Sequence, residues 1–167
     1  MSRFRADCSK CCGLCCVVPC FRSIQGFRED KRAEVPCVNL VSGHRCSIHA
    51  TRELLGYSAC RGFDCFGAGQ WITQDLFNGA LWSDAPDLAQ PMFQAYRVWL
   101  PRFAAAALLE AALPYVRADL RRTIVERMEK LSSAATRDDD LPTDSLQLRR
   151  ETLALIRTAL RPGAGEK

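Results

Sequence analysis

The positions of the cysteines constrain this chain more than any other feature of its sequence. All ten lie between residues 8 and 65, and the remaining 102 residues (167 minus 65) contain none. The densest segment holds Cys8, Cys11, Cys12, Cys15, Cys16 and Cys20. A tetrahedral ion or an iron-sulfur cluster needs several thiolates at one point, and two-residue spacers let one turn of chain direct successive sulfurs toward it. The N-terminal part therefore predicts a metal centre.

Three other uses of these cysteines are open at this point. Thiols pack as small hydrophobes, and ten cysteines can pair as five disulfides. The N-terminus lacks the basic segment and long apolar run of a secretory signal, so we expect a cytoplasmic chain. In a reducing compartment a cysteine framework binds metal more often than it forms disulfides. Thiol redox chemistry without metal is the third alternative.

Composition divides the chain near residue 70. Residues 1–70 are rich in Cys, Gly and turn residues, residues 71–162 are rich in Ala, Leu and Arg, and residues 163–167 are expected to form a disordered tail. We expect a mainly α fold, in which a small irregular cysteine-rich module held by metal is followed by a three-helix layer. The formal net charge of +4 comes from basic residues interleaved with acidic ones, so we expect neither nucleic acid nor membrane as a partner.

Apolar periodicity predicts three long helices in the second part, at residues 84–112, from Pro114 to about residue 134, and from Asp144 to Leu160. Pro101 predicts a kink or break in the first. The predicted inner face of the first helix is Met92, Tyr96, Trp99 and Phe103, and that of the third is Leu146, Leu153, Ile156 and Leu160. Before them, residues 36–49 predict a hairpin turning at Ser42-Gly43, and residues 71–77 predict a short helix ended by Asn78-Gly79.

The later cysteines complete a recognisable order. Pro36-Cys37-x-x-Leu40, Cys46-x-Ile48-His49 and Cys60-x-x-Phe63 follow the dense segment. Over residues 7–66 this order resembles the YkgJ-like zinc- or iron-chelating family, which is named for a CxxCxxCC signature. The resemblance implies the ligands Cys8, Cys11 or Cys12, Cys15, Cys16, Cys37, Cys46 and Cys60. Similar signatures occur in flagellin lysine methylases, where they imply an iron-sulfur cluster. Cys20 and Cys65 lie outside the pattern and are weaker candidates.

Two further features lie near the cysteines. His49 stands three residues after Cys46, a spacing that suits shared coordination as well as a surface or capping role. The segment Gly67-Ala-Gly69-Gln70 lacks the third glycine of a dinucleotide fingerprint and the Gly-Lys-Ser/Thr of a Walker loop. We expect these glycines to let the backbone approach the cluster or turn into the next segment.

The leading functional prediction is a cytoplasmic metal-binding protein whose cysteines coordinate zinc or an iron-sulfur cluster. The number of cysteines allows more than one metal. One alternative is an iron-sulfur-dependent oxidoreductase or radical-type modifying enzyme. Another is a zinc thiol redox sensor in which oxidation expels the metal and the helical half changes its protein partner.

Overall fold

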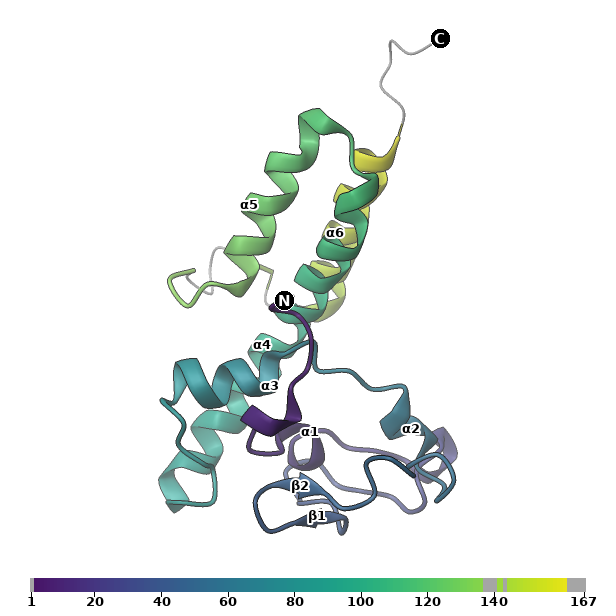
Figure 1. Cartoon of the computed structure of the whole chain (residues 1–167), viewed down its shortest axis with the longest axis vertical. Helices are drawn as coiled ribbons and strands as arrows, with labels where there is room; N and C mark the ends of the chain where they lie inside the picture. The colour runs from purple at the N-terminus through teal and green to yellow at the C-terminus, as the bar shows by residue number, and fades with distance from the viewer. Residues whose placement is uncertain (1, 137–140, 143, 162–167) are drawn as a thin grey trace. The chain divides into compact units, whose positions relative to one another are not determined.

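The computed structural model describes residues 2–136, 141–142 and 144–161, and the chain is mainly α, as predicted (Figure 1). Its helices and strands are α1 (Leu14–Val17), β1 (Leu40–Val41), β2 (Arg45–Cys46), α2 (Ser58–Arg61), α3 (Ala68–Trp71), α4 (Pro86–Ala112), α5 (Arg121–Ser132) and α6 (Ser145–Leu160). Short turns of other helix types are η1 (Cys8–Lys10), η2 (Ser23–Gln25), η3 (Ile72–Leu76), η4 (Leu113–Tyr115) and η5 (Ala118–Leu120). The tail expected at residues 163–167 lies outside the described residues.

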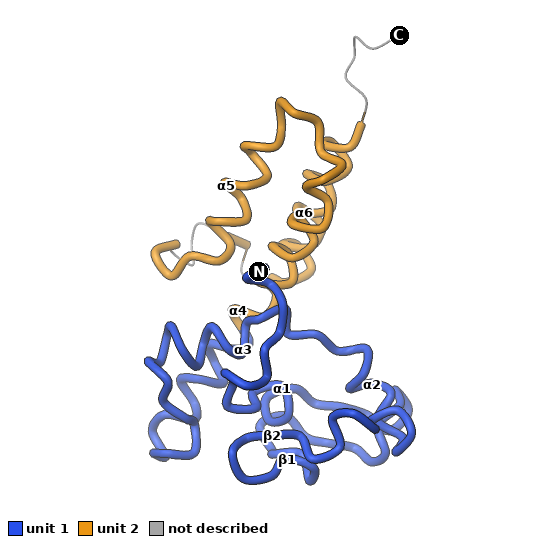
Figure 2. Tube along the Cα trace, in the orientation of Figure 1, with its two compact units in different colours: residues 1–97 blue, residues 98–167 orange. Residues whose placement is uncertain are grey.

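The chain forms two compact units, residues 1–97 and 98–167, which divide within α4 (Figure 2). All ten cysteines belong to the first unit. The predicted composition boundary near residue 70 stays a prediction. Among the described helices, none is both long enough and apolar enough to cross a membrane.

The first unit contains the predicted hairpin. Strands β1 and β2 pair antiparallel, with Leu40 opposite Cys46 and Val41 opposite Arg45. The connecting turn places both Gly43 and His44 at positive φ, which brings Cys46 back beside the chain that leads into β1. The predicted short helix is also present, as α3 continued by the π-helical turn η3, and it ends where Asn78 and Gly79 take positive φ.

Aromatic side chains form a buried cluster in the first unit. Phe21 stacks on Phe27 at 4.9 Å between ring centroids, and Tyr57 meets Phe27 edge-on at 4.7 Å. Cys37 and Cys60 pack against this cluster, so two of the predicted ligands are anchored on an apolar wall. Such edge-to-face and stacked pairs contribute about 0.5–1.5 kcal/mol each beyond their buried area.

The second unit is built from the C-terminal part of α4 with α5 and α6. The predicted inner face of α4 is buried along its length, and the helix continues through Pro101 without the predicted break. Helix α5 begins at Arg121, not at Pro114, because Pro114 lies in η4 and the extended ψ angles of Val116 (136°) and Arg117 (144°) interrupt the helix.

Helix α6 begins where the sequence predicted, but a different face is buried. The Asp144 carboxylate accepts hydrogen bonds from the Leu146 and Gln147 amides and caps the helix. The predicted inner face was wrong at its two ends, where Leu146 and Leu160 are 63% and 45% exposed. The buried positions are Leu148, Thr152 and Ala159. Thr152 is accommodated there because its hydroxyl donates to the Leu148 carbonyl one turn earlier.

Candidate metal centre

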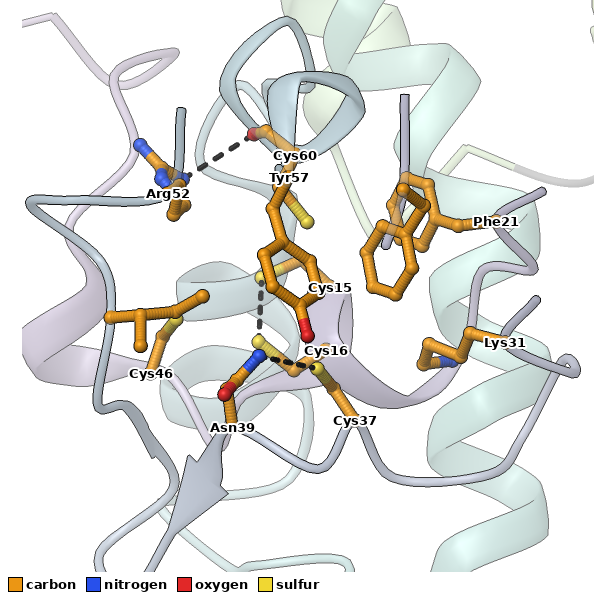
Figure 3. A pocket seen from close by; sticks show the side chains of 12 residues that line it. Cys15, Cys16, Phe21, Lys31, Cys37, Asn39, Cys46, Arg52, Tyr57 and Cys60 are labelled. Atoms are coloured by element: carbon orange, nitrogen blue, oxygen red, sulfur yellow. Dashed lines mark hydrogen bonds between the residues drawn. The ribbon is translucent and has the colours of Figure 1, made fainter. Parts of the chain in front are cut away.

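Eight of the ten cysteines line two adjoining cavities in the first unit. The smaller cavity, about 20 Å³, is lined by Cys15, Cys16, Cys37, Cys46 and Cys60 (Figure 3). The larger, about 540 Å³, shares four of these thiols and adds Cys8, Cys11 and Cys65. A single water molecule needs about 10–15 Å³ on the same measure, so the smaller cavity has the size of one ion. Figure 3 shows the sulfurs of Cys15, Cys16, Cys37 and Cys60 turned toward one space beside the Tyr57 ring.

Backbone hydrogen bonds bring these thiols together from distant parts of the sequence. Helix α1, which carries Cys15 and Cys16, is capped at its N-terminus by Gly13, which takes the left-handed conformation with φ 73°. The Cys16 carbonyl accepts from the Cys37 amide at 2.9 Å, which ties the approach to the hairpin to α1. Cys60 lies on α2, whose Ala59 amide donates to the Gly26 carbonyl at 2.9 Å. The clustering of the thiols therefore depends on contacts between α1, the segment around Gly26, the approach to the hairpin and α2.

One pair of sulfurs has the spacing of ligands to a tetrahedral ion, but the sulfurs do not converge on one point. Cys15 Sγ and Cys16 Sγ lie 3.9 Å apart, and the edge of a tetrahedron with Zn–S bonds of about 2.3 Å is about 3.8 Å. The Asn39 side-chain amide donates to Cys37 Sγ at 3.8 Å. As the side chains stand, no three His, Cys, Asp or Glu residues in the described ranges converge closely enough to hold an ion. All ten cysteines are free thiols.

Burial raises the pKa of several of these thiols. It raises the pKa of Cys11 to about 12. Burial, together with the neighbouring Cys37 and Cys15, raises the pKa of Cys60 to about 11. The hydrogen bond with Cys16 is the main cause that holds the pKa of Cys15 well above its ordinary value. Each of these groups must lose a proton to bind a metal, so metal uptake is expected to release protons.

Cys11 and Cys12 are adjacent in sequence but point into different environments. Cys11 lines the larger cavity. Cys12 is fully buried and lines neither cavity, and its sulfur shares a 3.3 Å hydrogen bond with the Thr73 hydroxyl. Trp82 Nε1 also donates to the Cys12 carbonyl at 2.8 Å. Of this pair, only Cys11 faces a cavity that other thiols line.

Two cationic side chains stand beside the thiols. Lys31 is only 8% exposed, and its ammonium donates to the carbonyl of Val17, the last residue of α1, at 2.8 Å and to that of Pro19 at 2.6 Å. Arg52 lines both cavities and donates to the Cys60 carbonyl at 3.4 Å. Burial lowers the pKa of Lys31, and the nearby thiols, of which Cys37 acts most strongly, oppose that shift. These cations can offset the negative charge of bound thiolates.

Tyr96 presents a buried polar group that lacks a partner. It is 1% exposed, and its hydroxyl has no hydrogen-bond partner within the described part of the chain. Burial raises its pKa well above the ordinary value, and neighbouring thiols, chiefly Cys15 and Cys65, add to that shift. A buried donor of this kind suits an electron-rich acceptor such as a metal-bound sulfur.

Cys20, His49 and two further polar residues near the cysteines take different positions. Cys20 is exposed and lines neither cavity. His49 lines the larger cavity, where burial and then Arg52 lower its pKa. His44 lines the same cavity, and its ring shares a hydrogen bond with Ser83 at 3.1 Å. Asp64 accepts from the Phe66 amide at 2.7 Å and so closes its own turn.

Sequence reasoning did not single out Lys31, Arg52 and Tyr57, which line the cavities, or Tyr96, which lines neither cavity but whose pKa the thiols raise. Each is one of several residues of its type along the chain, and no local spacing links any of them to the cysteines. Only Tyr96 carried a usable signal, because the periodicity of α4 placed it on the buried face. A phenol at a buried position requires a partner, and that requirement could have pointed to the thiols.

Comparison with known proteins identifies one relative. The chain is 34% identical over 134 residues to an uncharacterized protein, YybG, of Bacillus subtilis. The match covers 76% of this chain and 48% of that protein, so the chain spans about half the length of the curated relative it matches. No family model matches the sequence, and no solved structure matches the fold.

Proposed function

We propose that this chain is a metal-binding protein whose clustered cysteines coordinate zinc or an iron-sulfur cluster. One observation carries the proposal: eight thiols, drawn from residues 8 to 65, line two adjoining cavities of one compact unit. Soft thiolate ligands favour zinc and iron-sulfur centres over hard cations such as magnesium or calcium. The resemblance to the YkgJ-like family belongs to this proposal and points to the same thiols apart from Cys65.

The residues that would hold the metal are the thiols of the two cavities, after loss of their protons and rotation of their side chains. Lys31 and Arg52 would offset the thiolate charge, and Tyr96 would donate a hydrogen bond to a bound sulfur. A zinc ion would cross-link the loops, and an iron-sulfur cluster would supply electron transfer. A cytoplasmic location goes with the proposal, because a reducing compartment keeps free thiols available.

A specific observation favours the enzyme alternative as a second candidate. The larger cavity, at about 540 Å³, lies within the range of about 300–1,000 Å³ typical of small-molecule sites. A ligand in it would lie directly against the thiols, as an iron-sulfur-dependent oxidoreductase or radical-type modifying enzyme requires. The redox-sensor alternative gains less support, because buried thiols with raised pKa values are poor nucleophiles.

The test is metal, iron and sulfide analysis, with a visible absorption spectrum, on the full chain purified without oxygen. We expect at least one equivalent of zinc, or iron with matching sulfide and a broad thiolate-to-iron absorption band. Cys37→Ser and Cys60→Ser should lower the metal content. Cys20→Ser is the matched control, because that thiol is exposed and outside both cavities. A metal-free, colourless protein that takes up neither zinc nor iron would refute the proposal.

A further inference from the structure

The larger cavity contains three thiols that the smaller one lacks: Cys8, Cys11 and Cys65. The N-terminal turn η1 is fastened to α3 and to η3, the elements that follow Cys65. The Gln70 side-chain carbonyl accepts from the Asp7 amide, and the Gln74 amide donates to the Lys10 carbonyl at 2.9 Å. On its other side, Arg45 of β2 donates to the Cys8 carbonyl at 2.7 Å. These contacts hold the first cysteines beside Cys65.

Gly69 forms the surface on which two of these sulfurs lie. A Cβ added at Gly69 would lie 2.7 Å from Cys11 Sγ and 3.9 Å from Cys65 Sγ. The two sulfurs are therefore no more than 6.6 Å apart, the sum of those distances. Gly69 lies in α3, outside the left-handed region, so what the site uses is its missing side chain, not its conformational freedom. Any larger residue would displace the Cys11 sulfur.

Burial raises the pKa of the Cys65 thiol, which lies beside backbone donors. The amides of Gly69 and Gly67 lie close enough to its sulfur to oppose the rise in pKa that burial causes. Amides directed at sulfur are a common means of stabilising metal thiolates. Arg45, Arg52 and His49 line the same cavity, and so do Phe21 and Phe63, so its wall carries both charged and aromatic side chains.

We propose that Cys8, Cys11 and Cys65 form a second thiolate centre, separate from that of Cys15, Cys16, Cys37, Cys46 and Cys60. It has three protein ligands, and its remaining coordination position opens on the 540 Å³ cavity, where a small donor molecule can bind. Three protein ligands with an open position are typical of catalytic metal sites, whereas four protein ligands are typical of structural ones. This inference rests on the proposed function and assigns its second centre.

The experiment counts metal in the full chain with Co²⁺ as the probe, under anaerobic conditions. We expect two equivalents in the wild type, and one fewer in Cys65→Ser, in Cys11→Ser and in Cys37→Ser. The double variant of Cys65→Ser with Cys37→Ser should lose both, because the two thiols serve different centres. Gly69→Ala should weaken the second centre alone, and Cys20→Ser should change nothing. Azide should shift the cobalt absorption bands of the wild type but not those of Cys65→Ser.

The outcomes separate this inference from the proposed function. Wild-type protein that binds no cobalt, zinc or iron would refute the proposed function itself. Full metal content in Cys65→Ser would overturn the second centre and leave the proposed function standing. If Cys65→Ser and Cys37→Ser each abolish all binding, the thiols form a single centre, and the inference is wrong. Absence of an azide response in wild-type protein holding two equivalents would overturn the open position.

Discussion

Replacing Cys11 and Cys12 by alanine, one at a time, should have opposite consequences. Cys11 lines the larger cavity, and Cys12 is fully buried against Thr73. We expect Cys11→Ala to lose metal affinity while the metal-free protein keeps its stability. We expect Cys12→Ala to lose stability while keeping its metal. The two positions are adjacent, so each variant is the matched control of the other.

The size of each effect can be worked from these environments. Removing the buried Cys12 sulfur loses about 0.8 kcal/mol of apolar burial, as for one methylene, and a hydrogen bond worth about 0.5–1.5 kcal/mol. The total, about 1–2 kcal/mol, should lower Tm by about 3–8 °C in a chain of this length. A protein zinc site contributes about 10–16 kcal/mol. Shared over the three thiolates of the second centre, this is about 3–5 kcal/mol for each, so losing Cys11 should weaken zinc binding there by about 10²–10⁴-fold.

The assays are thermal unfolding of the metal-free protein, followed by circular dichroism, and zinc competition against a chromophoric chelator without oxygen. Stability must be measured without metal, because ligand binding itself raises Tm. The reasoning is refuted if Cys12→Ala loses zinc affinity as strongly as Cys11→Ala while both metal-free proteins remain equally stable. That result would mean that Cys12, not Cys11, faces the metal in solution.

Three further predictions concern the surroundings of the thiols. Tyr96→Phe should stabilise the metal-free protein by about 1 kcal/mol in urea unfolding, because it removes a buried hydroxyl that has no hydrogen-bond partner within the described residues. In the metal-bound protein it should shift the thiolate-to-metal absorption band without changing the metal content. An unshifted band would contradict the proposed hydrogen bond from Tyr96 to a metal-bound sulfur. Lys31→Met should weaken metal binding by about 10- to 100-fold in the competition assay, because it removes a buried positive charge that would offset the negative charge of the bound thiolates. Unchanged affinity would mean that Lys31 does not offset this charge. Metal-free protein should lose stability as the pH rises above 9.0. Below that pH the thiols are protonated in both states, whereas above it the unfolded chain loses protons first, because the folded-state pKa values of Cys60 and Cys11 are about 11 and about 12. The urea midpoint should therefore fall between about pH 9 and about pH 11, and a flat profile would mean that these thiols are exposed in solution.

The secondary structure that the sequence predicted correctly depends on local signals. The turn at Ser42-Gly43, the stop at Asn78-Gly79 and the Asp144 cap are short motifs whose backbone geometry depends on the residues themselves. The inner face of α4 was also correct, because large apolar residues mark it without ambiguity. The inner face of α6 was not, since its leucines lie on several sides and its neighbours in the second unit select which are buried.

For the candidate site, the sequence determined the kind of side chain, the thiol, and its clustering. Ten thiols within residues 8–65 predict soft-metal chemistry whatever the fold. Tertiary structure decided which thiols face the cavities. Cys11 and Cys12 are separated by one peptide bond, and contacts with Thr73 and Gly69, about sixty residues away, orient them differently. The same contacts bring Cys65 to the larger cavity. The spacing of two cysteines in the sequence limits how far apart their sulfurs can lie but does not set that distance. A metal site depends on the distances between sulfurs, and only the packing of distant segments sets those distances.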